Sequence, residues 1–304
     1  MQGVAVPSRF RYSFCLIVYN LYMFDLVPVE PVDYLVIGHV TEDITSAGPR
    51  LGGTTTFSSL TALSLGLRVG IVTAMSDKTP LKALEGIRVV NNPSQHTTTF
   101  ENIYAQDGRT QILHRRAALI PFESVPEVWR KAPIIHLGPV AQEISGVLPK
   151  DFTGSMIGIT PQGWMRTWDN AGHVVPYAWE SSQTLLPQAG AVVISRDDVG
   201  GDEELIESMA HQTRILAVTE ASAGSVLYWN GDRRRFRAPE VEEVDATGAG
   251  DIYAAAFFIR LSSTRDPWEA ARFATQLAAR SVKRSGLGGI PTQAEIEECL
   301  VEVF

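Results

Sequence analysis

Three observations predict an α/β fold with a mostly parallel central sheet flanked by helices. Short apolar runs rich in Val and Ile recur along the chain, amphipathic helical stretches separate several of them, and the runs are nearly continuous rather than alternating. Such runs are typical of parallel strands covered on both faces. The predicted strands are Tyr34–Gly38, Val69–Thr73, Ile134–Leu137, Met156–Ile159, Ala191–Ser195 and Ile215–Thr219.

Three helices are marked by their ends. The first should follow a glycine pair and stop at Gly66, a residue suited to a helix C-terminus. A second has a capping Asp, a Pro in its first turn and a Gly near its expected end. A third begins with a capping-box pattern, in which a Thr and a Glu cap the helix reciprocally. In order, these helices are expected at 54–65, from Asp266 and Pro267 to about Gly286, and from Thr292-Gln-Ala-Glu295 onward.

Two segments predict a small β lid rather than part of the main sheet. Residues 43–51 are short and extended, and residues 97–116 alternate and turn at Gln106-Asp-Gly108, which is a hairpin signal. Because the first segment is short, we expect a reduced lid.

The composition is ordinary for a soluble globular protein. With 304 residues, of which 45% are hydrophobic and 20% charged, the chain can form one large α/β domain or two small ones. The net charge of −8 and the absence of basic blocks other than Arg233-Arg-Arg235 argue against a nucleic-acid partner. We interpret that triplet as a solvated turn after Gly231-Asp232. Cys15 and Cys299 lie near opposite ends and imply neither a disulfide framework nor a metal site, which fits a reducing cytoplasm.

The first 32 residues lack a clear pattern. Two arginines precede an apolar run over residues 14–24, which resembles a signal peptide, but no small-residue cleavage site follows. Asn20 and Asp25 interrupt a run already too short to span a bilayer. We therefore expect a loosely patterned extension over 1–32, with Met23 as an alternative start, a main domain over 33–304, and no membrane partner.

The most informative stretch is Asp245-Ala-Thr-Gly-Ala-Gly-Asp251, which precedes an apolar helical run. A tight turn through Gly248, Ala249 and Gly250 can leave backbone N–H groups free at a helix N-terminus, where they and the helix dipole attract an anion such as phosphate. Asp251 then lies in the first helical turn. A carboxylate beside a bound phosphate is suited to act as a general base toward an attacking hydroxyl. The alternative is a capping Asp after a glycine turn.

This heptad resembles the C-terminal signature of the ribokinase-like (PfkB-type) sugar kinases, Asp-Thr-x-Gly-Ala-Gly-Asp, with Ala246 in place of the usual Thr. Other motifs are similar to that family in the same order, from about Tyr34 to about Glu297. They are Val36-Ile-Gly-His-Val-Thr-Glu-Asp43, Leu51-Gly-Gly53 and Val218-Thr-Glu-Ala-Ser-Ala-Gly224. The resemblance implies a ribokinase-like three-layer fold with a β lid.

For the acceptor, the resemblance implies that Asp43, at the end of a strand, accepts hydrogen bonds from two hydroxyls and that Gly52 and Gly53 face the acceptor. Ribokinases carry an Asn five residues after the first glycine of the pair, where this chain has Phe57. That exchange resembles the myo-inositol kinase branch. The stretch around Gln162 and Arg166 resembles it as well, so both side chains are candidates for contact with acceptor or phosphate, Arg166 alternatively being a surface cation.

For the donor, Ser195-Arg-Asp-Asp198 stands where the family has Asn-x-x-Glu, which orders magnesium and phosphates through water. Asp198 keeps an oxygen ligand but has a shorter reach. By the same resemblance, the nucleotide site includes Thr219, Ser222, Gly224 and Thr247, together with Gly286 in the segment 279–289. Asp245 is a candidate for a monovalent-cation site.

These features favour an ATP- and Mg²⁺-dependent kinase of a small sugar or cyclic polyol, with myo-inositol as the best single acceptor and K⁺ as a further candidate ion. Another sugar, a ketosugar acid or a nucleoside is the first alternative for the acceptor. A catalytically silent ligand-binding paralogue is the second, because the Ser195–Asp198 motif is altered. A dinucleotide-binding enzyme is disfavoured, since no Gly-x-Gly-x-x-Gly follows the first strand. We expect a cytoplasmic monomer or homodimer.

Overall fold

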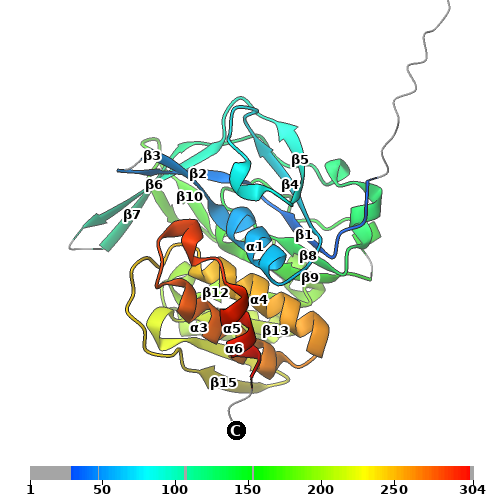
Figure 1. Cartoon of the computed structure of the whole chain (residues 1–304), viewed down its shortest axis with the longest axis vertical. Coiled ribbons are helices and arrows are strands. Elements are labelled where there is room, and N and C mark those ends of the chain that lie inside the picture. Colours follow the sequence, from blue (N-terminus) through cyan, green and yellow to red (C-terminus); the bar gives the residue numbers. More distant parts are fainter. Residues whose placement is uncertain (1–28, 47, 106–107, 153, 302–304) are drawn as a thin grey trace, which may run out of the picture.

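A wide, mostly parallel sheet organises the protein (Figure 1). The computed structural model describes residues 29–46, 48–105, 108–152 and 154–301. Within that part of the chain, nine strands form one sheet, in which neighbouring strands pair in parallel except for two antiparallel pairings at one edge. In spatial order these are β15 (Asp232–Phe236), β14 (Ser225–Trp229), β13 (Ile215–Thr219), β12 (Ala191–Ser195), β9 (Met156–Ile159), β8 (Ile134–Leu137), β1 (Tyr34–Ile37), β4 (Val69–Met75) and β5 (Arg88–Pro93).

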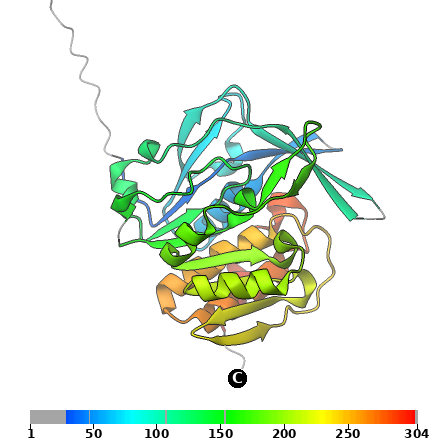
Figure 2. The ribbon, with the colours of Figure 1, turned by 180° about the vertical axis from the view of Figure 1, so that it is seen from behind.

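Helices cover both faces of this sheet and make a three-layer structure, as the opposite views in Figures 1 and 2 show. One face packs against α1 (Gly53–Ser64), α4 (Ala249–Thr264), α5 (Pro267–Ser281) and α6 (Gln293–Leu300). The other packs against α2 (Ser182–Leu185), α3 (Glu203–Gln212) and the 3-10 turns η2 (Phe122–Ser124), η3 (Glu127–Lys131), η4 (Lys150–Phe152) and η5 (Pro161–Trp164).

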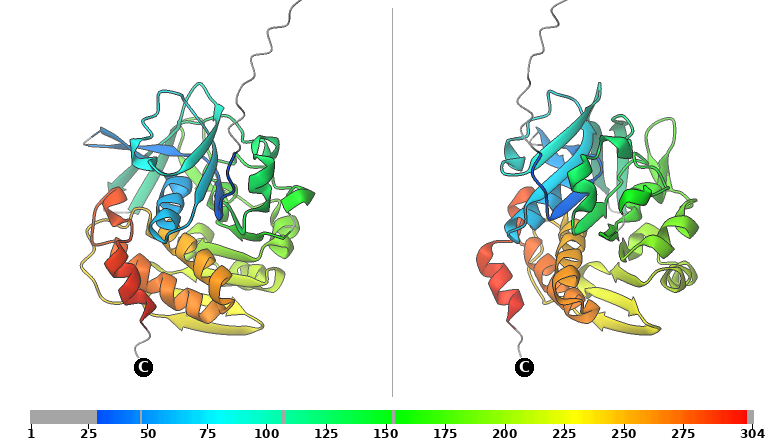
Figure 3. Two further views of the ribbon diagram at one scale, coloured as in Figure 1. Left: turned by 45° about the vertical axis from the view of Figure 1, so that its right-hand side comes forward. Right: turned by 90° about the vertical axis from the view of Figure 1, so that its right-hand side faces the viewer.

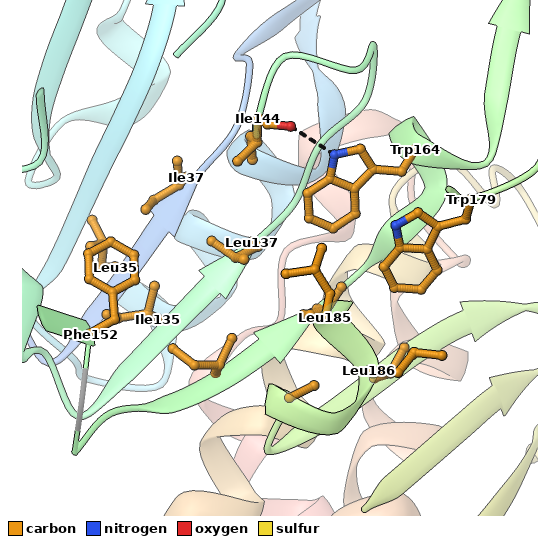
Figure 4. Close-up of a cluster of buried hydrophobic side chains, with 14 of the residues drawn as sticks. Leu35, Ile37, Ile135, Leu137, Ile144, Phe152, Trp164, Trp179, Leu185 and Leu186 are labelled. Atoms are coloured by element: carbon orange, nitrogen blue, oxygen red, sulfur yellow. Dashed lines mark hydrogen bonds between the residues drawn. The ribbon is translucent and has the colours of Figure 1, made fainter. Parts of the chain in front are cut away.

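Strand β1 shows why its residues are apolar without alternation. Leu35 and Ile37 belong to one core and Tyr34 and Val36 to the other, because successive side chains of a strand point to opposite faces. Figure 4 shows the first of these cores, where the stacked rings of Trp164 and Trp179 cover the sheet. The indole N–H of Trp164 donates to the Ile144 carbonyl at 2.9 Å, so this polar atom is buried with a partner.

A second, four-stranded sheet projects from one side of the main sheet and forms the lid (Figure 3). Its order is β3 (Gly48–Gly52), β2 (Thr41–Thr45), β6 (Thr98–Ala105) and β7 (Gly108–Arg115). A short hairpin, β10 (Arg166–Trp168) with β11 (Val174–Pro176), lies against β7, and the Leu113 amide donates to the Gly172 carbonyl at 2.8 Å.

The fold class predicted from the sequence is confirmed, and β8, β9, β12 and β13 have the predicted bounds. The lid strands agree with the two predicted segments to within two residues. Three other predictions concern residues that the structure does not describe: the turn at Gln106 and Asp107, the extension up to residue 28, and Cys15. The capping box at Thr292 and the Asp266 cap are both present.

Three local predictions are wrong. Arg233-Arg-Arg235 is not a turn but the middle of the exposed edge strand β15, where a polar strand needs no apolar face. Helix α5 ends at Ser281 rather than near Gly286, which instead begins the 3-10 turn η9 (Gly286–Gly289). Asp43 does not end the first strand; β1 stops at Ile37, and Asp43 is central in the separate lid strand β2.

No helix in the described part of the chain is both long and apolar enough to cross a membrane. Cys299 is buried and unpaired in α6.

Candidate active site

A cavity of about 590 Å³ lies between the lid and the carboxyl ends of the parallel strands. Thr160, Ser195 and Thr219, each at or just beyond the end of a strand, line it. Ligands of open α/β sheets bind at this edge. Most of the site residues predicted from the sequence also line the cavity, namely Asp43, Gly53, Phe57, Gln162, Arg166, Ser195, Asp198, Thr219, Ser222, Gly224, Thr247, Gly248, Ala249, Gly250 and Asp251.

The turn before α4 has the geometry of an anion site. Gly248 caps the helix with a left-handed backbone (φ +80°), which is readily adopted only by glycine. A Cβ at this position would come within 2.2 Å of the Phe57 ring, so packing also requires glycine. Gly250 and Asp251 follow in the first turn of a 16-residue helix, where amide groups and the helix dipole favour an anion.

Asp251 lies in this turn, partly exposed to the cavity. The pKa of its carboxyl group is raised to about 6, mainly by burial. The charges of Asp198 and Asp43 also act to raise this pKa, whereas a hydrogen bond from Thr54 and the charge of Arg166 act to lower it. A carboxylate with a pKa near the working pH is well matched to general-base catalysis. The backbone carbonyl of Asp251 accepts a hydrogen bond from the Ser58 hydroxyl at 3.2 Å, which joins α4 to α1.

The glycine pair makes room for Asp43. A Cβ on Gly52 would lie 2.2 Å from Oδ2 of Asp43, and one on Gly53 would lie 2.9 Å from Thr41. Gly53 also has a left-handed backbone (φ +82°) at the start of α1. The pair therefore lets the lid carboxylate approach the N-terminus of α1. Gly52 itself is buried and does not line the cavity.

Phe57 offers little surface to an acceptor. Its side chain is only 2% exposed, and the ring packs against Gly248. Phe57 can therefore offer an acceptor only a small apolar contact, and the main role of the ring in this geometry is to support the anion turn.

Arg166 connects the lid to the centre of the cavity. Its Nε donates to the Val140 carbonyl at 2.9 Å and one terminal nitrogen donates to Gln111 of the lid at 2.6 Å. The guanidinium lies 5.1 Å from the centroid of the Phe100 ring, which is within cation–π range. Arg166 is half-buried and faces the cavity, so it is not a surface cation.

Asp198 is held at the opposite wall. Its Oδ2 accepts from the Ser195 amide at 2.8 Å, and the two residues form a capping box on η7 (Arg196–Val199). Its Oδ1 accepts from Gln162 at 3.1 Å, and burial raises the pKa of the carboxyl group. In the described residues, no three His, Cys, Asp or Glu side chains cluster as a metal cage. Magnesium usually binds few carboxylates together with water and phosphates, so Asp198 fits that role through water.

The expected donor side has an apolar wall. Ala278 and Ala279 of α5 line the cavity together with Ala238, Pro239 and Val241. The hairpin between β13 and β14 closes one end, where Gly224 is left-handed (φ +98°) and a Cβ would come within 2.0 Å of the Phe236 carbonyl.

Asp245 and Gly286 do not line the cavity but are hydrogen-bonded to each other. The Gly286 amide donates to Oδ2 of Asp245 at 2.8 Å, Ser285 donates to the same oxygen at 3.1 Å, and the Thr247 amide donates to Oδ1 at 2.9 Å. Burial acts to raise the pKa of Asp245, but these hydrogen bonds outweigh it and lower the pKa. Asp245 therefore ties the anion turn to the segment before η9.

Sequence reasoning missed many of the lining residues, among them Thr54, Phe100, Asn102 and Gln111. Thr54 directly follows the glycine pair at the start of a predicted helix, and this position was the one signal in the sequence that it could line a ligand site. The other three lie in lid strands, where alternation fixes two faces but not which one covers the cavity.

Comparison with known proteins identifies similar sequences and similar structures. Residues 179–293 match the family described as pfkB family carbohydrate kinase. The chain is thus similar to this family over a segment that makes up less than half of its length. Among the curated relatives, 5-dehydro-2-deoxygluconokinase of Bacillus licheniformis is 32% identical to this chain over 143 residues. The matched region covers 41% of this chain and 44% of that protein. The chain is 41% identical over 136 residues to ribokinase of Bacillus subtilis, covering 44% of this chain and 41% of that protein.

The matched stretches thus span less than half of either pfkB-family relative. A structural likeness covers much more of the chain. A pyrophosphate-dependent kinase in the ribokinase family, solved with a pyrophosphate analogue and myo-inositol, superimposes with a TM-score of 0.70 at 21% identity, over 88% of this chain and 100% of that one. This likeness confirms the ribokinase-like fold.

Proposed function

We propose that the chain is an ATP-dependent phosphotransferase that phosphorylates a hydroxyl of a small sugar or cyclic polyol. The observation that carries the proposal is Asp251, a carboxylate with a pKa raised to about 6, placed beside the glycine turn of Gly248 in a cavity large enough for two small ligands. General-base catalysis next to a phosphate site is what such a pair supplies.

In the proposed reaction, Asp251 takes the proton from the acceptor hydroxyl as its oxygen forms a bond to the γ-phosphorus. The bond from that phosphorus to the bridging oxygen breaks, and ADP leaves with the electron pair. The amides of the turn around Gly248 face the phosphoryl group in transfer and stabilise its charge. Mg²⁺ supplies further neutralisation of the phosphates when bound, with Asp198 as its protein partner through water.

Asp43 and Arg166 are the proposed acceptor contacts. Asp43 reaches the cavity from the lid and accepts hydrogen bonds from hydroxyl groups, while Gln162 and Arg166, from η5 and β10, line the same cavity. Placing the hydroxyl between Asp43 and Asp251 orients it for in-line attack, and positioning of this kind lowers the barrier without new chemistry.

ATP is favoured as the donor by the apolar wall of Ala278, Ala279 and Val241, since a nucleobase buries apolar surface and pyrophosphate does not. Pyrophosphate is the second candidate, because the structural neighbour described above uses it. Rates with Mg·ATP and with magnesium pyrophosphate, each at saturating acceptor, distinguish the two. A higher kcat/KM with pyrophosphate would refute the ATP assignment.

The best single acceptor is myo-inositol. Phe57 replaces the Asn typical of ribokinases, so an acceptor hydrogen bond is lost, and a site that loses such a bond discriminates differently between hydroxylated rings. A ketosugar acid is the second candidate. Arg166 is the one basic side chain among the residues that line the cavity, and a guanidinium suits a carboxylate.

A panel measurement tests the acceptor. We expect kcat/KM for myo-inositol to exceed the values for ribose, fructose, 2-keto-3-deoxygluconate and adenosine at saturating donor and Mg²⁺. A larger value for any of the four would overturn the substrate assignment and leave the kinase assignment intact. Tight ligand binding without turnover on any acceptor or donor would instead favour a silent binding paralogue.

A further inference from the structure

Arg50 reaches from the lid to the segment before η9. It lies on β3 directly opposite Asp43 of β2, and directly paired residues of neighbouring strands share a face of the sheet. Asp43 lines the cavity, so Arg50 lies on the same face of the lid sheet as this cavity residue, although it does not itself line the cavity. One terminal nitrogen of Arg50 donates to the Ser285 hydroxyl at 3.4 Å and so connects the lid to the C-terminal segment.

Short hydrogen bonds connect this contact to the turn that would hold phosphate. Ser285 donates to Asp245 at 3.1 Å, and Asp245 accepts from the Thr247 amide at 2.9 Å. Thr247 is the residue before Gly248. The Arg50 guanidinium is therefore separated from the anion turn by two side chains.

The charges of the cavity make a second cation useful. Asp43, Asp198 and Asp251 line it together with Glu240 and Glu243, whereas Arg166 is its one basic lining residue and donates to Gln111 and Val140. A donor with several phosphate charges meets a net acidic wall, and like charges repel.

Arg50 can supply the missing charge. It is exposed and forms no ion pair with any residue that the structure describes. Its contact with Ser285, at 3.4 Å, is longer than the usual N–H···O range of about 2.7–3.2 Å. Guanidinium groups carry five donors in a planar fork that matches phosphate oxygens.

We propose that Arg50 is a phosphate-binding residue carried by the lid, which contacts the terminal phosphates of the donor and couples closure of the lid over the acceptor to occupancy of the donor site. The inference rests on the proposed phosphotransferase function. It differs from a purely structural lid contact, which would affect acceptor and donor alike and would not depend on the phosphates.

The test compares Arg50→Gln and Arg50→Lys with Arg115→Gln as a matched control. Arg115 is also an exposed arginine of the lid, but it lies on β7, the edge strand opposite to β3. Calorimetric titration of the full chain measures the Kd of Mg·AMP-PNP and of AMP, and steady-state kinetics measure KM for donor and acceptor.

We expect Arg50→Gln to weaken Mg·AMP-PNP and raise the donor KM by about ten-fold or more, the loss typical of one charge-assisted hydrogen bond. The Kd of AMP and the acceptor KM should stay within about two-fold of those of Arg115→Gln. Arg50→Lys should recover part of the loss, because it keeps the charge but not the fork.

Equal donor constants in Arg50→Gln and Arg115→Gln would overturn the inference while the wild type still transfers phosphate. A parallel loss of AMP binding and acceptor binding, or a lower melting temperature common to both Arg50 variants, would show a structural contact instead. Absence of phosphoryl transfer in the wild type itself would count against the proposed function, and the AMP-PNP titration would still decide whether Arg50 binds phosphates.

Discussion

Asp251 lies in the first turn of α4, where burial raises its pKa from 3.8 to about 6, so its replacement by Asn should act on catalysis and on stability in opposite directions. For catalysis, the amide of the Asp251→Asn variant cannot accept a proton. Loss of a general base typically costs about 10²- to 10⁴-fold in kcat. Binding of acceptor and donor should stay within a few-fold, because the amide keeps the shape and most of the hydrogen bonds of the carboxylate.

For stability, the sign follows from the raised pKa. Between about pH 4 and pH 6 the native protein retains a proton that the unfolded chain has released, so the free energy of unfolding falls as pH rises through this window and stays lowered above it. A rise in pKa from 3.8 to about 6 corresponds to about 3 kcal/mol, an upper bound since the carboxylate keeps some solvent contact. Asp251→Asn should therefore be more stable than wild type at pH 7.5, and this advantage should vanish near pH 4.

The assay pairs coupled ADP release at pH 7.5 with denaturant unfolding at pH 4 and pH 7.5. Asp77→Asn is the matched control, since Asp77 is exposed and does not line the cavity. A variant at position 251 that keeps more than a tenth of wild-type kcat refutes the general-base role. Equal stability changes at both pH values would refute the electrostatic reasoning.

Three further perturbations probe the pH dependence, the anion turn and the N-terminal extension. The wild-type kcat/KM should fall about ten-fold per pH unit below a limb near pH 6, where Asp251 becomes protonated; a pH–rate profile from pH 4.5 to 8 checks this, and a flat acid limb contradicts it. Gly248→Ala should lower kcat/KM by about a hundred-fold or more and lower the free energy of unfolding by about 2 kcal/mol. The reason is that alanine is strained in a left-handed backbone and its methyl group would clash with the Phe57 ring. A kcat/KM within three-fold of wild type would be incompatible with that geometry. Deletion of residues 1–22, which lie outside the described structure, should leave a soluble and active protein in the same coupled assay, and loss of either property would show that the segment belongs to the fold.

The central sheet could be predicted from the sequence because its strands are buried on both faces. Val192 and Ile194 pack on one side and Ala191 and Val193 on the other, so the whole segment must be apolar and its ends are sharp. Edge strands carry no such requirement. The polar strand β15, which pairs only with β14, resembles a turn in sequence and was predicted as one.

The site could be predicted where backbone conformation demands a residue type. Gly248 and Gly53 are left-handed, and both were recognised as glycines of a ligand site. The contacts made by Asp43, Gln111 and Arg166 depend instead on how the lid folds over the sheet, which no local pattern specifies. The exchange of Asn for Phe57 was visible, but its packing under Gly248 became apparent only in three dimensions.

The joint between α1 and α4 has a consequence for changing specificity. Within five residues of α1, Thr54 bonds the Asp251 carboxyl group, Phe57 packs on Gly248, and Ser58 bonds the Asp251 backbone. Substitutions in this part of α1 that change the choice of acceptor would therefore also disturb Asp251 and Gly248. We expect most variants from a library of α1 substitutions to have a lower kcat. The lid positions Asn102 and Gln111 face the same cavity from a separate sheet, which makes them the places where a new acceptor could be admitted at little cost in rate.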